Sequence, residues 1–382
     1  MKEIGYRIFA FMYILYSHLP LKKNSAFLIM THDGGGEGNV AVEGEYFRKT
    51  YGTVIAELRR EDTVFSGKQG LWTAWKFFFI KSCKMARAEY IFMDNEFLPM
   101  AYFNVRQNTK VVQLWHGTGT IKKFGQHVNK GKIYKLEKRA NRNIDYVIVN
   151  SEATQKLYAE CFSVDVNQVK VLGLPRTDIL FSEAEKKRRR QDLLNEFPEL
   201  VGKKLILYAP TFRDQDVKHP KMCLDVKKME KELPEDYIIG LRLHPFVAAN
   251  FHLYEIDKRV IDFSQYSNLN TLLMATDILI TDYSSIIFEY CVFQKPMIFF
   301  AYDLDEFSNY GRGFYRDYKS YVPGPVVSCT EEIIQVIKNR DWKKKLWKPF
   351  FEEAYKYTDG NSTIRIANFI KRNGTKKGSC KK

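Results

Sequence analysis

The segment ILITDYSSIIFEY, residues 278–290, joins an apolar run typical of a buried strand to an apolar pattern typical of a helix. Asp282, Ser284 and Ser285 stand at the junction. A helix that begins near Ser284 presents unpaired backbone amides and the positive end of its dipole there, and both attract anions. The common alternative is a serine that only caps its own helix. The segment therefore predicts a strand–turn–helix unit with a candidate phosphate site.

Glu289 lies four residues after Ser285, one helical turn further along the same face. From there a carboxylate can reach past phosphates toward a ribose diol, whereas the alternative is a surface glutamate. Together, the two serines and Glu289 are typical of a seat for a nucleotide diphosphate.

Strand and helix signals alternate along almost the whole chain, which indicates an α/β protein with parallel sheets. The apolar runs predict strands at 25–32, 88–94, 110–117, 145–151 and 169–176, and then at 203–211, 237–245, 259–264, 277–282 and 295–301. The charged run 183–197 predicts a helix between the two series. We therefore expect domains at 1–180 and 181–370, followed by a basic tail at 371–382. Two Rossmann-like domains that face each other across a cleft fit these pieces, with ligands at the carboxyl ends of strands.

The stretch QLWHGTGTIKKFG, residues 113–125, places His116 at a strand end in a glycine-rich turn. A histidine titrates near neutral pH and can take a proton from an attacking hydroxyl. The alternative is a histidine that is hydrogen-bonded within a loop. The placement favours a catalytic base.

Basic residues also stand at the ends of two more predicted strands. RLHPF offers Arg242 and His244, and YAPTFRD offers Thr211 and Arg213. Arginine is usually a surface or salt-bridge residue, but several basic strand ends in one chain favour a shared phosphate ligand.

The glycine-rich stretch THDGGGEGN, residues 31–39, suits close approach of the backbone to a second substrate. We expect the acceptor to contact Asp33, Gly35, Gly36 and Asn39. Val40 replaces the third glycine of a dinucleotide fingerprint, and no P-loop motif is present. The sequence therefore disfavours both NAD binding and P-loop hydrolysis.

Two carboxylate pairs, at 214–216 and 303–305, resemble metal-binding Asp-x-Asp motifs. Such pairs are frequent in solvated loops, and no further ligand set accompanies them. We expect no metal and no cofactor. The six cysteines form no Cys-x-x-Cys pair, which favours a reducing cytosol over a disulfide framework.

The net charge of +15 predicts an anionic partner, which leaves nucleic acid, an anionic bilayer and a phosphorylated small molecule open. The apolar run at 6–16 is shorter than the ~20 residues of a spanning helix, and no cleavage site follows it. This run and the aromatic cluster at 70–84 have basic flanks, which suit helices lying on anionic lipid. Buried core helices are the alternative. Nucleic-acid binding through the basic stretch 122–142 is a weaker hypothesis.

Taken together, WHGTGTIKK, YAPTFRD, RLHPF, TDYSSIIFEY, YDLDEF and DGNSTIRI resemble the CDP-glycerol glycerophosphotransferase family of wall teichoic acid synthesis, over roughly residues 110–370. The resemblance implies a GT-B fold without a catalytic metal, on the cytoplasmic face of a bacterial membrane. It also implies transfer of glycerol phosphate from CDP-glycerol to a lipid-linked hydroxyl, with release of CMP. By this resemblance His116 is the base and His244 binds or protonates the donor phosphates. The resemblance further implies Thr211, Arg213, Ser284 and Ser285 around the pyrophosphate and Glu289 near the ribose.

The length of the chain favours the glycerol phosphate primase branch, because polymerases of the family often carry a large additional N-terminal region. The expected acceptor is then the N-acetylmannosamine of an undecaprenyl-diphosphate-linked disaccharide. A glycerol- or ribitol-phosphate polymerase and a GT-B hexosyltransferase that uses a nucleotide sugar stay open, and so does the oligomeric state.

Overall fold

The computed structural model describes residues 2–32, 36–67, 69–211, 213, 222–248 and 259–373, without the side chains of residues 245, 246 and 310. Asp33 and Gly35 of the expected acceptor site lie outside the described residues, and so do Asp214 and Asp216. The chain forms two compact units. The first contains residues up to Thr118, Phe124–Asp178 and the chain from Tyr355 onward, and the second contains Gly119–Lys123 and Ile179–Ala354.

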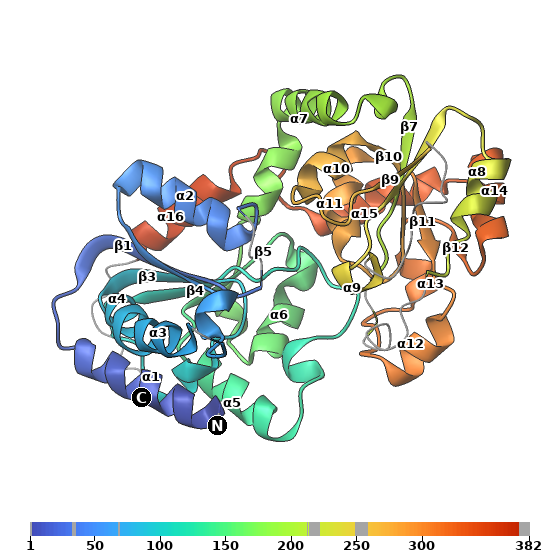
Figure 1. The fold of residues 1–382 in the computed structure, drawn as a ribbon. Coiled ribbons are helices and arrows are strands. Elements are labelled where there is room, and N and C mark those ends of the chain that lie inside the picture. The colour runs from blue at the N-terminus through green and yellow to red at the C-terminus, as the bar shows by residue number, and fades with distance from the viewer. Residues whose placement is uncertain are drawn as a thin grey trace. The chain divides into compact units, whose positions relative to one another are not determined.

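The first unit is built on a six-stranded parallel sheet in the order β2-β1-β3-β4-β5-β6 (Figure 1). Its strands are β1 (Lys22–Met30), β2 (Val54–Arg59), β3 (Ala88–Met93), β4 (Lys110–Gln113), β5 (Tyr146–Val149) and β6 (Val169–Val171). Most of these strands are continuous apolar runs, because helices cover both faces of the sheet.

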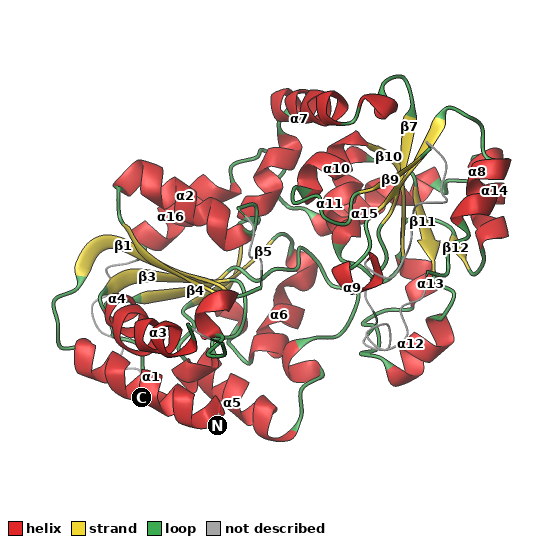
Figure 2. Ribbon diagram, viewed as in Figure 1, coloured by secondary structure: helices red, strands yellow, loops and turns green. Residues whose placement is uncertain are grey.

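Helices flank the first sheet on both sides (Figure 2). They are α1 (Lys2–Tyr16), α2 (Asn39–Tyr51), α3 (Gly70–Trp75), α4 (Ser82–Ala86), α5 (Gly131–Asn141), α6 (Gln155–Phe162) and α16 (Ser362–Arg372), with a π-helix at Lys76–Lys81 between α3 and α4. Helices α2 and α16 share one core with the sheet, in which Phe47 and Ile366 are fully buried. Asp178 caps α16 by accepting hydrogen bonds from the amides of Ser362 and Thr363, both at 2.8 Å.

The second unit has its own six-stranded parallel sheet, in the order β12-β11-β10-β7-β8-β9. Its strands are β7 (Lys204–Tyr208), β8 (Tyr237–Leu241), β9 (Val260–Asp262), β10 (Thr276–Thr281), β11 (Met297–Phe300) and β12 (Val326–Val327). Its helices are α7 (Glu183–Glu196), α8 (Val226–Glu232), α9 (Pro245–Ala248), α10 (Leu269–Ala275), α11 (Ile286–Tyr290), α12 (Leu304–Tyr310), α13 (Tyr318–Tyr321), α14 (Thr330–Asn339) and α15 (Trp347–Ala354). Helices α8 and α14 pack on one face, and α10, α11 and α15 lie on the other (Figure 1).

Two parallel α/β units confirm the expected fold class, while the GT-B arrangement of the units stays a prediction. The chain leaves the first unit after Asp178, close to the boundary expected at 180. It returns to that unit with α16, because α16 buries Ile366, Ala367 and Ile370 in the first core. The expected second domain, 181–370, therefore includes residues from Tyr355 onward that belong to the first unit.

Helix α1 has two apolar faces, so it fits neither sequence alternative alone. Phe9 and Tyr13 are fully buried, whereas Ile4 and Phe11 are 63% and 66% exposed. The aromatic cluster behaves in the same way, with Phe77 buried and Leu71 90% exposed. None of the described helices is long and apolar enough to cross a bilayer.

Candidate functional site

Asp94 organises the carboxyl edge of the first sheet. It follows β3 directly, is fully buried, and accepts hydrogen bonds from the amides of Thr31 at 2.9 Å and His32 at 3.3 Å. Strands β1 and β3 are neighbours in the sheet, so these strand ends meet. Asp94 thereby fixes the chain at the point where the glycine-rich stretch leaves β1.

His116 lies at the same edge, after β4, and its ring is held in place. Its Nδ1 lies 2.8 Å from the backbone oxygen of Asp94. A carbonyl oxygen can only accept a hydrogen bond, so in neutral His116 the proton sits on Nδ1 and the lone pair on Nε2. The ring stacks on His32 with centroids 3.5 Å apart and an interplanar angle of 5°. This geometry suits a general base.

Asn39 and Arg176 hold the backbone that carries His116. Asn39 is fully buried, and its Nδ2 donates to the carbonyls of Leu114 and Trp115, at 3.3 Å and 2.9 Å. Its Oδ1 accepts from the amide of Arg176 at 3.1 Å, and the Arg176 guanidinium donates to the carbonyl of His116. Trp115 has a φ of 55°, a left-handed conformation that is uncommon for a bulky residue. These bonds stabilise that conformation.

Of the expected acceptor residues that the structure describes, Asn39 is buried and Gly36 is exposed. Asn39 uses its amide inside the unit, so the structure gives it a positioning role rather than the ligand contact that the sequence predicts. Gly36 is exposed, and a Cβ added there meets no atom within 4 Å. Gly36 is thus compatible with a ligand contact.

At the carboxyl edge of the second sheet, Asp282 is the corresponding organising residue. It is 1% exposed, and its Oδ1 accepts from the amides of Thr211 at 2.8 Å and Tyr283 at 2.6 Å. The Thr211 hydroxyl is buried and has no hydrogen-bond partner in the described part of the chain. That hydroxyl is therefore a candidate contact for a ligand, as the sequence predicts.

Arg213, which the sequence places around the pyrophosphate, is paired with two carboxylates in the structure. Its guanidinium forms an ion pair with Asp282 and a two-pronged pair with Asp303, at 2.9 Å and 3.0 Å. It also lies over the ring of Tyr283, 5.1 Å from the centroid. Because two carboxylates surround one guanidinium, this group carries no excess positive charge. Arg213 thus braces the site, and Asp303 of the suspected Asp-x-Asp motif is its partner.

Lys122 supplies positive charge at the Asp282 cluster. The segment around it belongs to the second unit. There the backbone amide of Lys123 donates to the carbonyl of Gly313 at 3.1 Å, and the backbone amide of Tyr315 donates to the carbonyl of Ile121 at 3.3 Å. Among the described residues, no carboxylate or hydrogen-bond acceptor lies within bonding distance of the Lys122 ammonium. Burial lowers its pKa to about 8, although the charge of Asp282 opposes the change. A buried cation without a bonded counter-ion favours an anionic ligand.

Arg242 is a second cation that no described carboxylate neutralises. It follows β8, next to β7 in the sheet, and donates to the carbonyls of Phe263 at 3.3 Å and Tyr266 at 2.6 Å. No ion pair of Arg242 occurs within the described ranges, and burial lowers its pKa. His244 lies two residues further on, where its backbone oxygen accepts from the amides of Val247 and Ala248 in α9. The strand-end placement of both residues agrees with the sequence prediction.

The helix after Ser284 is shorter than the sequence suggests. Helix α11 begins at Ile286 and has five residues, so its dipole is weaker than expected. The Ser284 hydroxyl accepts from the amide of Ile286 at 3.4 Å, while the Ser285 side chain makes no cap bond. Glu289 is 2% exposed, which differs from the surface glutamate that was the alternative.

The two sheet edges thus offer complementary chemistry. The first holds the His116 imidazole, whose Nδ1 contacts the Asp94 carbonyl, and the second holds cations and a hydroxyl beside Asp282, which is paired with Arg213. Within the described residues, no group of three or more histidine, cysteine or acidic side chains is arranged to hold a metal.

Comparisons with known proteins match the sequence to one family. The profile of CDP-Glycerol:Poly(glycerophosphate) glycerophosphotransferase matches residues 11–372. A teichoic acid poly(ribitol-phosphate) polymerase of Bacillus spizizenii is 34% identical over 97% of this chain and 60% of its own length. A teichoic acid glycerol-phosphate primase of Bacillus subtilis is 35% identical over 75% of this chain and 74% of its own length. The chain spans 51% to 60% of the ribitol-phosphate polymerases that it matches.

Solved structures share the fold. The wall teichoic acid polymerase TagF has a TM-score of 0.79 and 22% identity, with 98% of this chain and 95% of that chain covered. A UDP-GlcNAc 2-epimerase from Neisseria meningitidis has a TM-score of 0.61 and 14% identity, with 91% and 100% covered. At these identities the likeness concerns the fold alone.

Proposed function

Because the chain belongs to the CDP-glycerol:poly(glycerophosphate) glycerophosphotransferase family, we propose that it transfers a polyol phosphate from a CDP-alcohol to a lipid-linked teichoic acid acceptor and releases CMP. We place CDP-glycerol first as the donor. The proposed acceptor is the N-acetylmannosamine hydroxyl of an undecaprenyl-diphosphate-linked disaccharide. The observation that carries the proposal is the His116 imidazole, whose Nδ1 contact with Asp94 directs the basic lone pair to Nε2.

The reaction needs one proton transfer and one displacement at phosphorus. The acceptor oxygen bonds to the phosphorus that carries glycerol, and its proton passes to Nε2 of His116. The bond from that phosphorus to the bridging oxygen breaks, and its electron pair leaves with CMP. General-base help of this kind contributes about 10²–10⁴ in rate.

Phosphoryl transfer also requires stabilisation of negative charge on the transferred group and on the leaving group. We assign this to Lys122, Arg242 and His244, with the Thr211 hydroxyl as a further donor. Arg213 contributes by holding Asp282 and Asp303 in place. Ser284, Ser285 and Glu289 complete the proposed donor site, with Glu289 toward the ribose.

The test is release of CMP from CDP-glycerol in the presence of the lipid-linked disaccharide. His116→Asn should lower kcat at least a hundredfold with little change in the affinity for CDP-glycerol, because asparagine cannot accept the proton. His127→Asn is a matched control from the same unit. Equal rates for wild type and His116→Asn would remove His116 from the chemistry. Turnover of UDP-sugars but of no CDP-alcohol would instead favour a hexosyltransferase.

A poly(ribitol-phosphate) polymerase reaction is the second candidate, because the B. spizizenii polymerase aligns with 97% of this chain. Two comparisons separate the candidates: CDP-glycerol against CDP-ribitol, and the bare lipid disaccharide against the same lipid that already carries one glycerol phosphate. A primase acts on the bare lipid and stops after one addition. A polymerase prefers the primed lipid and adds many units.

We also propose that the protein works at the cytoplasmic face of the bacterial membrane as a peripheral protein. The exposed apolar side chains of α1 and α3 support this, among them Phe11, Leu71 and Trp72. Phe11→Ser with Trp72→Ser should lower co-sedimentation with anionic vesicles without lowering the melting temperature. Unchanged co-sedimentation would contradict the assignment of this surface.

A further inference from the structure

A cavity of about 530 Å³ lies at the amino edge of the first sheet. Its floor is apolar, with Tyr16 from the end of α1, Phe79 and Ile80. Three cations line it, Lys22 at the start of β1, Lys84 in α4 and Arg87 just before β3, and none of the described aspartates and glutamates does. The cavity therefore combines an apolar body with a positive rim.

The three cations have no anionic partner within the described chain. Lys22 and Lys84 are exposed, and their ammonium groups make neither an ion pair nor a hydrogen bond with a described residue. Arg87 donates from Nε to the carbonyl of Pro20 at 3.1 Å, which leaves its two terminal nitrogens without an acceptor there. Three positive residues that line one cavity without a described carboxylate favour a phosphate or a similar anion.

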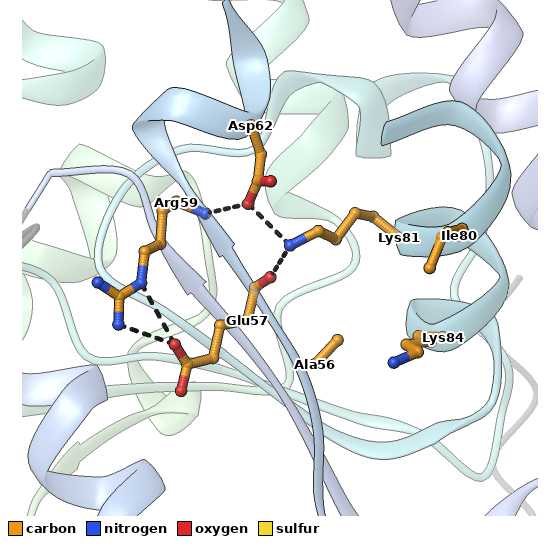
Figure 3. Close-up of a pocket in the computed structure, with 7 residues that line it drawn as sticks. All are labelled: Ala56, Glu57, Arg59, Asp62, Ile80, Lys81 and Lys84. Atoms are coloured by element: carbon orange, nitrogen blue, oxygen red, sulfur yellow. Dashed lines mark hydrogen bonds and ion pairs between the residues drawn. The ribbon is translucent and has the colours of Figure 1, made fainter. Parts of the chain in front are cut away.

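The neighbouring cavity, of about 460 Å³, provides the contrast. Figure 3 shows two of its three cations bound to carboxylates: Arg59 pairs with Glu57 at 2.9 Å, and Lys81 pairs with Asp62 at 2.8 Å. Lys84 lines both cavities, and in Figure 3 no interaction joins it to the other labelled residues. Arg59 and Lys81 are therefore neutralised by carboxylates, whereas Lys22, Lys84 and Arg87 have no carboxylate partner in the described part of the chain.

The cavity with the unpaired cations adjoins the exposed apolar surface. Tyr16 ends helix α1, whose Ile14 and Leu15 are 47% and 52% exposed. Phe79, which is 41% exposed, belongs to the same aromatic run as Trp75. A ligand that joins an anionic group to apolar chains matches both features.

We propose that this cavity binds the phosphate headgroup of an anionic membrane phospholipid, with its acyl chains toward α1 and Phe79. The proposal rests on the membrane-surface location proposed above and adds a specific lipid site to it. The diphosphate of the acceptor is a poorer occupant. Strand β1 separates Lys22 from Met30 by roughly 26 Å, and His116 lies beyond its far end, stacked on His32. Two sugar rings do not bridge that distance.

The test compares two double variants of the full chain that each lose two charges. Lys22→Met with Lys84→Met alters the cavity, whereas Lys23→Met with Lys76→Met leaves it intact. Neither Lys23 nor Lys76 lines the cavity, and Lys76 lies over the ring of Trp72. The probe is dihexanoyl-phosphatidylglycerol below its micelle concentration, titrated by calorimetry against the phosphatidylcholine of the same chain length, inorganic phosphate and farnesyl diphosphate.

We expect saturable binding of the phosphatidylglycerol to wild type, at least a tenfold weaker affinity for the cavity variant and less than a twofold change for the control. If the lysines acted only through non-specific electrostatic attraction, the affinity of both double variants for phosphatidylglycerol vesicles would fall equally, by roughly thirtyfold. Equal losses, no saturation, or tighter binding of inorganic phosphate or farnesyl diphosphate would each overturn the proposal. Release of CMP with a soluble acceptor should persist in the cavity variant. If wild type turns over no CDP-alcohol, the proposed function fails while the lipid result still stands.

Discussion

Replacement of Lys122 by methionine should stabilise the ligand-free protein and weaken its affinity for CDP. The ammonium of Lys122 is largely buried beside Asp282, and Arg312 adds positive charge nearby. No described residue neutralises it by a direct bond. A charged group placed in this way destabilises the ligand-free protein, and it contributes favourably only when an anionic ligand is bound. Methionine has a similar length and no charge, so it removes the cost together with the binding energy.

The magnitude follows from the pKa of Lys122, which burial lowers from 10.5 to about 8. A difference of this size corresponds to about 3 kcal/mol as an upper bound. Between pH 8 and 10.5 the unfolded chain binds more protons than the folded chain, so the free energy of unfolding should rise with pH over this window. Below pH 8 the full penalty is present. The free energy of unfolding of Lys122→Met should therefore exceed that of wild type by up to ~3 kcal/mol at pH 7. The variant should not show the increase in this free energy between pH 8 and 10.5.

Urea unfolding at pH 7 and pH 9.5 measures both effects, and Lys123→Met serves as the control because it changes the neighbouring lysine on the same segment. Calorimetric titration with CDP and CMP measures the binding. The affinity for CDP should fall more than the affinity for CMP, since CDP carries the second phosphate. Lys122→Met that is no more stable than wild type at pH 7, or that keeps the rise in stability up to pH 9.5, would refute the reasoning.

Arg213→Met should lower the free energy of unfolding by about 3–5 kcal/mol, because it leaves Asp282 and Asp303 buried without their partner, and a loss below 1 kcal/mol in urea titrations would contradict this role. Glu43 is fully buried, its carboxyl oxygens have no partner in the described chain, and burial raises its pKa well above 4.5. The folded chain then binds the extra proton, so the free energy of unfolding of wild type should fall as pH rises above about 4.5, and the fall should be smaller in Glu43→Gln; parallel pH profiles of the melting temperature would exclude this. Asn39→Ala should lower the free energy of unfolding by about 1–3 kcal/mol and should lower kcat more than the affinity for CDP-glycerol. An unchanged kcat would contradict the positioning role of Asn39.

Much of the fold could be predicted from apolar runs, because strands buried on both faces stand out in a sequence. The strand expected at 277–282 is β10, Thr276–Thr281, and the helix expected at 183–197 is α7, Glu183–Glu196. Strand β2 was missed because it is an edge strand of mixed polarity whose first four residues are only half-buried. Strand β12 has only two residues, too few for a pattern.

The site was predictable in outline but not in its pairing. Parallel strands bring their carboxyl ends to one edge, so strand-end residues such as Thr211 and Arg242 could be identified from the sequence. The pairing of Arg213 with Asp303 joins residues far apart along the chain, and no local pattern encodes it. His32 belongs to the glycine-rich stretch, but its stacking on His116 depends on the adjacency of β1, β3 and β4. The charge balance of the site therefore became visible only in three dimensions.

The direction of α1 connects the proposed lipid site with the proposed chemistry. The amino end of α1 lies near the carboxyl edge of the first sheet, since Glu3 accepts a hydrogen bond from Tyr102 at 2.6 Å in the segment that follows β3. Its carboxyl end, at Tyr16, lines the cavity at the amino edge. Fifteen residues of helix span about 22 Å, so α1 runs antiparallel to β1 along most of the sheet. A helix that rests its exposed face on the bilayer then holds both sheet edges close to the lipid surface. A phospholipid at one end of α1 and a lipid-linked acceptor near His116 at the other end can therefore occupy the protein at the same time.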